Sequence, residues 1–366
     1  MKGDKMANIL RFEPEAGRRI LVVSDIHGNL PYFKGLLEKA GFCDKDELII
    51  DGDFLEKGPD SLGTLRYVME LSKKGNVHAL CGNCDDWHTI YNTDDPNIEA
   101  EILRFVLYKK CGLVWDMCHS AGIDPFEAED FAHIKAQLRQ EFAPEWAFLS
   151  SLPHAIETKN FIFTHGGVQP GLPLEEHRAD RLQRFDSFMT QGLSFDKWVI
   201  VGHWPVMLYG TDKVCANPII DRKSRIVSID GGCVLKDDGQ LNALIIPHRD
   251  SDAFHFVSYD PFPQMRVLDY QPEGAKSYYI RWGDSRVQVL ERGEEFSRCR
   301  HVRTGYEMDI LTKYLFTDNE FTDCNDCTDY RPELFAGDVV SVVEKSSRGY
   351  FIKHKGTSGW YAGRLE

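Results

Sequence analysis

The N-terminal part of the chain alternates short apolar runs with amphipathic segments. Apolar runs of strand length occupy residues 19–24, 48–51 and 77–81, and leucine and phenylalanine recur at helical spacing within 29–40 and 61–73. Strands that alternate with helices in this way are typical of α/β proteins whose sheet is largely parallel. The pattern therefore predicts a β-α-β-α-β start to the fold.

A polar cluster follows each of these three predicted strands. The clusters are Asp25-Ile26-His27-Gly28, Gly52-Asp53 and Gly82-Asn83-Cys84-Asp85. In open α/β sheets, ligands bind beyond the carboxyl ends of the strands. The three clusters are therefore expected to meet at one site.

Strand patterns return after a helical stretch at 87–150. Further strands are predicted at 161–164, 198–201 and 226–229, and polar or glycine-rich clusters follow them at His165-Gly166-Gly167, Gly202-His203 and Asp230-Gly231-Gly232. The turn-forming Asp237-Asp238-Gly239 predicts a hairpin between 232–236 and 240–246.

The helical signal fades beyond residue 250. Three prolines in Asp260–Pro272 predict a connector, which we place at 251–275. Alternating strand-like segments then run to the end of the chain, so residues 276–366 are expected to form a small all-β domain.

The strand exits carry side chains suited to divalent metal ions. Oxygen and nitrogen donors stand at Asp25, His27, Asp53, Asn83, His165 and His203. This mixture suits Mn, Fe, Zn or Mg, and manganese is the expected ion. Any one of these residues alone is better explained as a helix cap or turn residue. Six at successive strand exits favour a site for two ions, which could activate water for phosphoryl displacement.

Composition and charge narrow the protein class. The chain has 366 residues, of which 42% are hydrophobic and 27% charged, as expected for a globular protein of two or three domains. No apolar run is long enough for a membrane span, and the N-terminus has no signal-peptide pattern. The net charge of −14 disfavours general nucleic-acid binding. Ten scattered cysteines indicate reduced thiols, so a cytoplasmic location is expected.

The ordered motifs resemble those of the calcineurin-like metallophosphoesterases. The resemblance covers residues 18–247 and rests on Ser24–Gly28, Gly52–Ser61 (GDFLEKGPDS), Gly82–Asp85, Thr164–Gly171 (THGGVQPG) and Gly202–Pro205. It is greatest to the phosphoprotein phosphatase branch and its bacterial relatives, which include symmetrical diadenosine tetraphosphatases. The resemblance implies a four-layer αββα sandwich, here a catalytic domain at 18–250 with 87–150 as a helical insert.

The resemblance also implies a role for each candidate ligand. Asp25 and His27 would hold one ion, and Asn83, His165 and His203 would hold the other. Asp53 would bridge the two ions. A metal-bridging hydroxide would then attack phosphorus directly.

Three departures from the family pattern concern the other site residues. Cys84 stands where the phosphatase branch has a histidine that protonates the leaving group, and a neutral thiol is a poor proton donor. Glu56-Lys57 replaces an Asp-Arg pair, and lysine lacks the bidentate fork that arginine offers to phosphate. Arg184 is the best match for a second phosphate-binding arginine, with Arg181 as the alternative.

The implied catalytic set is therefore Glu56, Lys57, Cys84 and Asp85, with Lys57 and Arg184 binding substrate. Each also has a plain structural interpretation: Cys84 as a packing residue, Glu56-Lys57 as a solvated pair and Arg184 on a solvated helix face. His78 and His88 are two further candidates for the missing acid.

Two features lie outside the family motifs. Residues 337–365 resemble a bacterial SH3-like barrel, for which capture of a peptide, restriction of substrate, a dimer contact or simple cover of the catalytic domain are all consistent roles. Cys324-x-x-Cys327 could be half a zinc site or a redox pair, but exposed loop cysteines are the favoured interpretation.

We therefore predict a two-metal hydrolase of phosphomonoesters, with a phosphoprotein or small phosphoester as substrate. The weak acid at Cys84 predicts a preference for aryl phosphates, phosphotyrosine, phosphoanhydrides or activated diesters. Gly-Asn-Cys-Asp is typical of phosphodiesterases, whereas Pro205 replaces a histidine that many of them have. A phosphodiesterase or dinucleotide polyphosphate hydrolase is thus the first alternative. An SH3-like binding protein with a nearly inactive metal site is the second.

Overall fold

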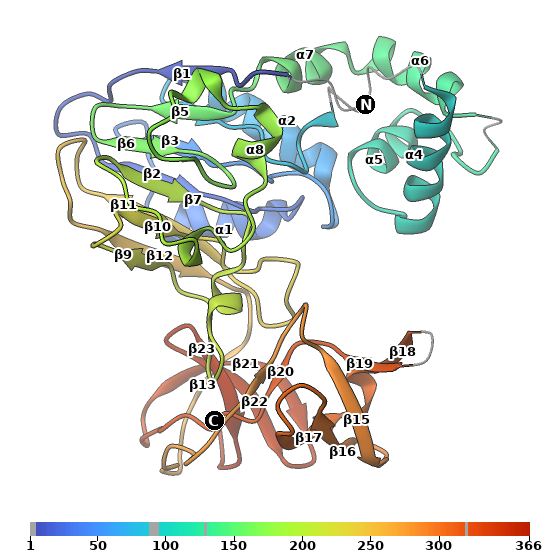
Figure 1. Cartoon of the computed structure of the whole chain (residues 1–366), viewed down its shortest axis with the longest axis vertical. Helices are drawn as coiled ribbons and strands as arrows, with labels where there is room; N and C mark the ends of the chain where they lie inside the picture. Colours follow the sequence, from blue (N-terminus) through green and yellow to red (C-terminus); the bar gives the residue numbers. More distant parts are fainter. Residues whose placement is uncertain (1–4, 88–94, 128–129, 319–320) are drawn as a thin grey trace. The chain divides into compact units, whose positions relative to one another are not determined.

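The computed structural model describes residues 5–87, 95–127, 130–318 and 321–366 (Figure 1). The chain divides into two compact units. Unit 1 contains the chain up to Trp204 together with Pro218–Leu235 and Gln240–Tyr259, and unit 2 contains Pro205–Asn217, Lys236–Gly239 and Asp260–Glu366.

Unit 1 contains a five-stranded sheet built around the predicted N-terminal strands. Its order is β12 (His255–Tyr259), β11 (Leu241–Ile246), β2 (Ile20–Val23), β3 (Glu47–Ile50) and β4 (Val77–Ala79). β2, β3 and β4 are parallel, and β11 and β12 extend the sheet in antiparallel pairs. The carboxyl ends of β2, β3 and β4 therefore lie at the same edge.

A six-stranded sheet forms the other half of unit 1. Its order is β1 (Ile9–Arg11), β5 (Ala155–Glu157), β6 (Phe161–Phe163), β7 (Trp198–Val201), β10 (Ile226–Ser228) and β9 (Ile219–Asp221). β6, β7 and β10 are parallel, so the three later polar clusters follow strands that run in one direction.

Alternating side chains on these strands divide the interior into layers. Ile20 and Val22 of β2 pack with Phe163 and Ile200 of the other sheet, in a core between the two sheets. The intervening residues of β2 face a second core with α1 (Leu30–Lys39) and α2 (Ser61–Ser72). A third core covers the outer face of the six-stranded sheet with α8 (Ala179–Gln183), η1 (Leu174–Glu176) and η2 (Phe188–Thr190). These layers confirm the predicted αββα sandwich.

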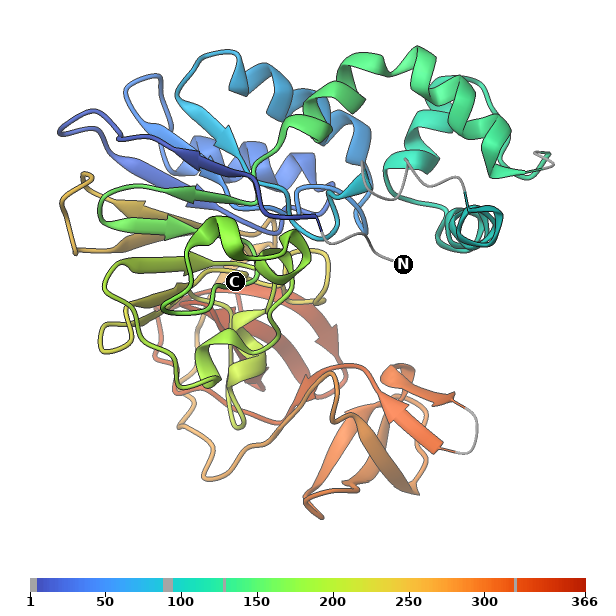
Figure 2. The same ribbon diagram turned by 45° about the horizontal axis from the view of Figure 1, so that its top comes forward.

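The predicted helical insert consists largely of helices that lie together in both views (Figures 1 and 2). They are α4 (Pro96–Lys109), α5 (Leu113–Ser120), α6 (Phe131–Glu141) and α7 (Ala143–Ser151). Their buried residues join the same core as α1 and α2. Among the helices of the described residues, none is long and apolar enough to cross a membrane.

Unit 2 is all-β apart from short 3₁₀ turns, the longest of which are η3 (Val206–Tyr209) and η4 (Thr312–Tyr314). One sheet has the order β13 (Gln264–Arg266), β21 (Val339–Ser346), β22 (Gly349–His354), β23 (Thr357–Tyr361) and β8 (Val214–Cys215). Another has the order β17 (Glu307–Leu311), β16 (Phe296–His301), β15 (Arg286–Glu291), β19 (Phe321–Cys324) and β18 (Leu315–Asp318). β14 (Tyr279–Ile280) pairs with β20 (Cys327–Thr328). The C-terminal all-β region is confirmed, whereas its SH3-like identity stays a prediction.

Three expectations are wrong in detail. β11 pairs with β2 and β12, while Gly232 and Gln240 form an isolated bridge, because pairing with β2 places the side chains of β11 in the cores on both faces of the sheet. The predicted connector at 251–275 contains β12 and β13, whose short alternating patterns the neighbouring prolines obscure. Cys324 and Cys327 are buried in a hydrophobic core rather than exposed, and their Sγ atoms lie 3.9 Å apart.

The insert is joined to α2 by a carboxylate from α5. Asp116 Oδ2 accepts hydrogen bonds from the backbone N–H groups of Ser61, at 2.7 Å, and Leu62, at 3.2 Å. Because the first N–H groups of a helix have no partner within the helix, Asp116 caps α2 from a distant part of the chain.

We expect Asp116→Ala to lower the free energy of unfolding by about 1–2 kcal/mol, because two buried N–H groups lose their acceptor. Urea denaturation followed by circular dichroism would measure the change. Glu70→Ala, which removes a carboxylate that is 69% exposed on α2, serves as the control and should cost no more than about 0.5 kcal/mol. Equal effects of the two substitutions would contradict the capping role.

Candidate metal centre and its two pockets

Sharp turns after the strands aim the predicted ligands at one edge of unit 1. Asp25, His27, Asp53 and His203 have φ values of 57°, 50°, 50° and 64°. These are left-handed conformations that non-glycine residues seldom adopt, and they persist only where the surrounding structure compensates the strain. The strained backbone is therefore concentrated where the ligand side chains converge.

Two glycines allow the turns to approach closely. A Cβ atom at Gly82 would overlap the backbone nitrogen of Asp53, and one at Gly202 would overlap the side chains of Ser24 and Asp25. Larger residues at these positions would separate the loops, which explains the glycines beside the ligands.

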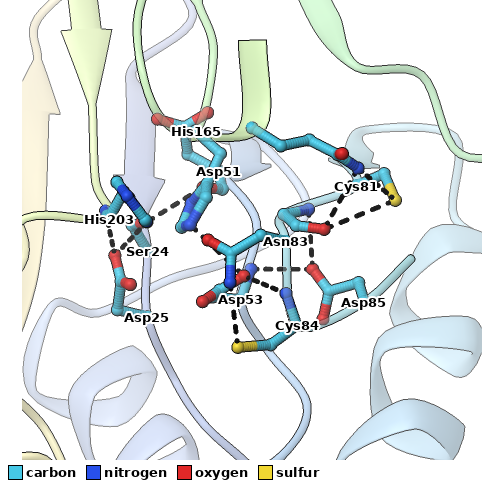
Figure 3. Close-up of polar contacts among 12 residues, drawn as sticks. Ser24, Asp25, Asp51, Asp53, Cys81, Asn83, Cys84, Asp85, His165 and His203 are labelled. Carbon is cyan, nitrogen blue, oxygen red and sulfur yellow. Dashed lines mark hydrogen bonds and ion pairs between the residues drawn. The ribbon is translucent and has the colours of Figure 1, made fainter. Parts of the chain in front are cut away.

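All six predicted ligands are brought together: Figure 3 labels five of them, and His27 lies beside Asp25 and Asp53. Asp53 Oδ1 lies 3.2 Å from His165 Nε2, and Asp25 Oδ1 lies 3.7 Å from His27 Nε2. The backbone N–H of His203 donates to Asp25 Oδ2 at 3.0 Å, and the rings of His165 and His203 are 5.3 Å apart between centroids. Asn83 precedes Cys84, whose backbone N–H donates to Asp53 Oδ1 at 2.7 Å.

Hydrogen bonds on the far side of each imidazole fix its orientation. His27 Nδ1 lies 3.3 Å from the Leu55 carbonyl, and His165 Nδ1 lies 2.9 Å from the Asp51 carbonyl. His203 Nε2 lies 3.0 Å from Asp186 Oδ1. A ring nitrogen that donates outward leaves the other nitrogen available as a metal ligand.

Three buried ligand atoms have no hydrogen-bond partner among the described residues: Asp25 Oδ1, Asn83 Oδ1 and His165 Nε2. His165 Nε2 is near Asp53 Oδ1, but the two are not aligned for a hydrogen bond. Buried polar atoms normally have hydrogen-bond partners, so three ligand atoms without one in a single cluster form a set that a cation would complete. The residues present therefore fit divalent metal ions.

The charges of the cluster lead to the same conclusion. Burial raises the pKa of Asp25 to about 6. Burial alone would lower the pKa of His165, but the carboxylates of Asp53 and Asp25 outweigh it and raise that pKa to about 10. Without a metal ion, an imidazolium must supply the positive charge that the two carboxylates require.

Cys84 and Asp85 have different positions relative to this cluster. Burial, and then the charge of Asp53, raises the pKa of the Cys84 thiol well above its ordinary value, so the thiol is neutral. Asp85 is fully buried and accepts the backbone N–H groups of Asp53, Leu55 and Gly82 at 2.7, 3.1 and 2.9 Å. The carboxyl group of Asp85 thus holds two ligand loops together, and its predicted catalytic role stays a prediction.

Glu56 is buried, whereas Lys57 is exposed, so the plain interpretation as a solvated pair fails for Glu56. Glu56 Oε1 accepts the indole N–H of Trp87 at 2.8 Å and the backbone N–H of Leu113 at 2.7 Å, so it joins the site to α5. Lys57 Nζ lies 3.5 Å from His27 Nε2. Burial works to lower the pKa of Lys57, but electrostatic interactions with Cys84 and with the carboxylates of Asp53 and Asp25 leave that pKa raised, and the side chain stays cationic. A catalytic role for either residue stays a prediction.

Two pockets open beside the ligands and share Asn83 and Arg184. A polar pocket of about 570 Å³ is also lined by Gln169, His177, Arg181 and His203. A larger pocket of about 1000 Å³ is lined mostly by apolar side chains, together with Lys57 and Cys84. Arg184 thus reaches both pockets, whereas the alternative, Arg181, reaches only the polar one.

Of the alternative acids, the one that the structure describes does not join this site. His78 Nε2 is paired with Glu47 Oε1 at 2.7 Å, away from the ligands, and His88 lies outside the described residues. Sequence reasoning missed Asp186, because its partner His203 is distant along the chain. It also missed Asp230, a fully buried residue with an unpartnered Oδ2, although Asp230 does follow a predicted strand.

Residues 18–219 match the calcineurin-like phosphoesterase family, and the chain belongs to this family. The predicted family is thereby confirmed.

Relatives include the symmetrical bis(5'-nucleosyl)-tetraphosphatase of Shewanella frigidimarina, 25% identical over 217 residues, which are 57% of this chain and 68% of the relative. The enzyme of the same name from Buchnera aphidicola subsp. Schizaphis graminum is 46% identical over 67 residues, or 18% of this chain. The chain spans only 24% of the length of that curated relative. Among solved structures, a protein serine/threonine phosphatase from Saccharomyces cerevisiae aligns with 71% of this chain and 85% of its own at 12% identity, with a TM-score of 0.43.

We expect Mn²⁺ to raise the melting temperature of the metal-free protein by several degrees, because a ligand that binds only the folded state stabilises it. His165→Ala should lose most of this shift, as it removes a ligand atom. His133→Ala, which removes a surface histidine that is 82% exposed, is the matched control and should keep it. Differential scanning calorimetry with and without Mn²⁺ measures the shift, and an equal response of both variants would argue against the site.

Proposed function

We propose that the protein is a dinuclear-metal phosphoesterase that hydrolyses phosphomonoesters, with Mn²⁺ as its metal. The observation that carries this proposal is the convergence of three unpartnered ligand atoms, from Asp25, Asn83 and His165, around the Asp53 carboxylate. Two divalent ions, when bound, would supply Lewis-acid activation of water and neutralise charge on the phosphoryl oxygens.

The two ligand groups share one residue. Asp25, Asp53 and His165 form one group of closely spaced donor atoms, and Asp53 also belongs to a group with His27. A carboxylate common to both groups is the natural bridge between two ions. This supports Asp53 as the bridging residue. The same grouping places Asp25 with His165 and His27 with Cys84, so the division of the other ligands, with Asp25 and His27 on one ion and Asn83, His165 and His203 on the other, rests on the family resemblance.

The chain's own cations complement the phosphate. Lys57 and Arg184 both line the larger pocket, beside Asn83. Each would hold a phosphoryl oxygen, which concentrates an anionic substrate at a site on an otherwise acidic protein. Glu56 would act by fixing the loop that carries Lys57, since its carboxylate is bonded to Trp87 and Leu113.

A dinucleotide polyphosphate is the second candidate substrate. Two pockets, of about 570 and 1000 Å³, meet at Asn83 and Arg184, so a substrate with two large ends could place one in each. The names of the relatives from Shewanella and Buchnera agree with this alternative.

With Mn²⁺ present, we expect p-nitrophenyl phosphate to be hydrolysed faster than bis-p-nitrophenyl phosphate. Asp53→Asn should lower the rate by more than about 100-fold, because the bridging carboxylate loses its charge. Asp44→Asn, which changes a carboxylate that is 78% exposed, is the control and should leave the rate unchanged. Release of p-nitrophenolate is the measurement.

Faster hydrolysis of the diester would instead favour the phosphodiesterase alternative. Absence of turnover with either compound, in protein shown to contain metal by elemental analysis, would overturn the phosphoesterase proposal and favour a binding protein.

The neutral thiol of Cys84 leads to an expected dependence on the leaving group. Wild type should hydrolyse aryl phosphate much faster than phosphoserine, because an alkoxide needs protonation and a phenolate needs little. Cys84→His should raise the rate on phosphoserine by about 10- to 100-fold and change the aryl rate little. Phosphate release from a phosphoserine peptide and from phenyl phosphate tests this.

The control for that experiment is Cys43→His, which adds an imidazole at an exposed position and should leave both rates as in wild type. Similar wild-type rates on the two substrates would show that another group supplies the proton.

A further inference from the structure

The larger of the two pockets has an apolar wall that the metal chemistry does not require. One end of the pocket is formed by Asn83, Cys84 and Lys57, next to the ligand cluster. The other end is formed by α4, a helix of the insert. A single cavity therefore runs from the candidate metal centre to a part of the chain that supplies none of the ligands.

One face of α4 supplies this wall. Ile98, Ile102 and Phe105 follow one another at i, i+4 and i+7, which places them on the same side of a helix, and all three line the pocket. Ile98 and Phe105 remain 36% and 46% exposed. The helix thus presents bulky apolar side chains to the cavity instead of burying them fully in the core.

A second aromatic side chain of the pocket is held in place by the site itself. The ring of Trp87 is 5% exposed, and its indole N–H is bonded to Glu56. Leu235 lines the pocket as well. Because the hydrogen bond fixes Trp87, the pocket has a preformed aromatic residue in addition to Phe105.

The charges of the two pockets indicate which part of a substrate each one suits. The polar pocket contains Arg181, His177 and Gln169, which can bind an anionic or strongly hydrogen-bonding group. In the larger pocket Lys57 and Arg184 accompany the ligand cluster, whereas α4 contributes Ile98, Ile102 and Phe105 together with the charged Glu101 and Lys109. A volume of about 1000 Å³ is far more than a phosphoryl group fills and suits a sizeable organic molecule.

We propose that this pocket binds the leaving group of the substrate and selects an aromatic group larger than a phenyl ring, with α4 as the specificity element. The inference rests on the proposed function, because it places the phosphoryl group at the ligand cluster. The occupant is aromatic since rings pack favourably against the side chains of Trp87 and Phe105, which both line the pocket.

Binding of non-hydrolysable phosphonates to the Mn²⁺-loaded full-length protein tests this inference. We expect 1-naphthylmethylphosphonate to bind at least about tenfold more tightly than methylphosphonate, as measured by isothermal titration calorimetry. Phe105→Ala should weaken binding of the naphthyl compound about five- to tenfold and leave methylphosphonate unchanged. Tyr108→Ala, on the same helix but 80% exposed and outside the pocket, is the matched control and should change neither.

Leu235→Ala, which changes another residue that lines the pocket, repeats the test if circular dichroism shows that Phe105→Ala does not fold. Equal affinity for the two phosphonates, or equal effects of Phe105→Ala and Tyr108→Ala, would overturn the inference. Hydrolysis of 1-naphthyl phosphate is measured in parallel. A naphthyl preference that depends on Phe105, without turnover, would support the pocket and refute the proposed phosphoesterase activity. Turnover without such a preference would support the phosphoesterase activity and refute the role of the pocket.

Discussion

The structure of unit 1 depends on a cluster of buried carboxylates and imidazoles, in which several polar atoms have no hydrogen-bond partner among the described residues. Asp25, Asp53 and His165 are almost completely excluded from water, and atoms of Asp25 and His165 accept or donate no hydrogen bond. Such a cluster is costly in a low-dielectric interior unless a cation compensates it. The left-handed turns, the glycines beside them and the oxygen atoms that bond to the far nitrogen of each histidine hold these groups in place against that cost.

The helical insert is connected to this cluster through buried polar contacts. Glu56, three residues after the candidate bridging ligand, accepts hydrogen bonds from Trp87 and from the start of α5. Asp116 of α5 in turn caps α2. One continuous set of contacts thus fixes Lys57, the Trp87 ring and the insert relative to the ligands. A pocket whose walls come from the insert can therefore have a defined shape, as specificity requires.

The departures from the family pattern fit this arrangement. Cys84 occupies a place beside Asp53 where a neutral thiol cannot readily protonate a leaving group, and the adjacent Asp85 is committed to three backbone N–H groups. The side chains that remain near a bound phosphoryl group are cations, Lys57 and Arg184, rather than acids. Under the proposed function, selectivity would then come from the stability of the leaving group and from the pocket that holds it.

The sequence alone determined the parallel strands, the helical insert and the six candidate ligands, because each of these depends on local pattern and on polar residues at strand ends. It also indicated the calcineurin-like family through the order of five short motifs. Tertiary structure decided what local pattern cannot encode. β11 pairs with β2 across more than two hundred residues, and β12 and β13 are too short for their alternation to outweigh nearby prolines. Likewise, Glu56 accepts a hydrogen bond from Leu113 of the insert, and buried Asp85 accepts hydrogen bonds from backbone N–H groups. Residues of α4 line a pocket beside the ligand cluster. All three features result from long-range packing. Such contacts join residues far apart in the chain, so their partners become visible only when the chain is folded.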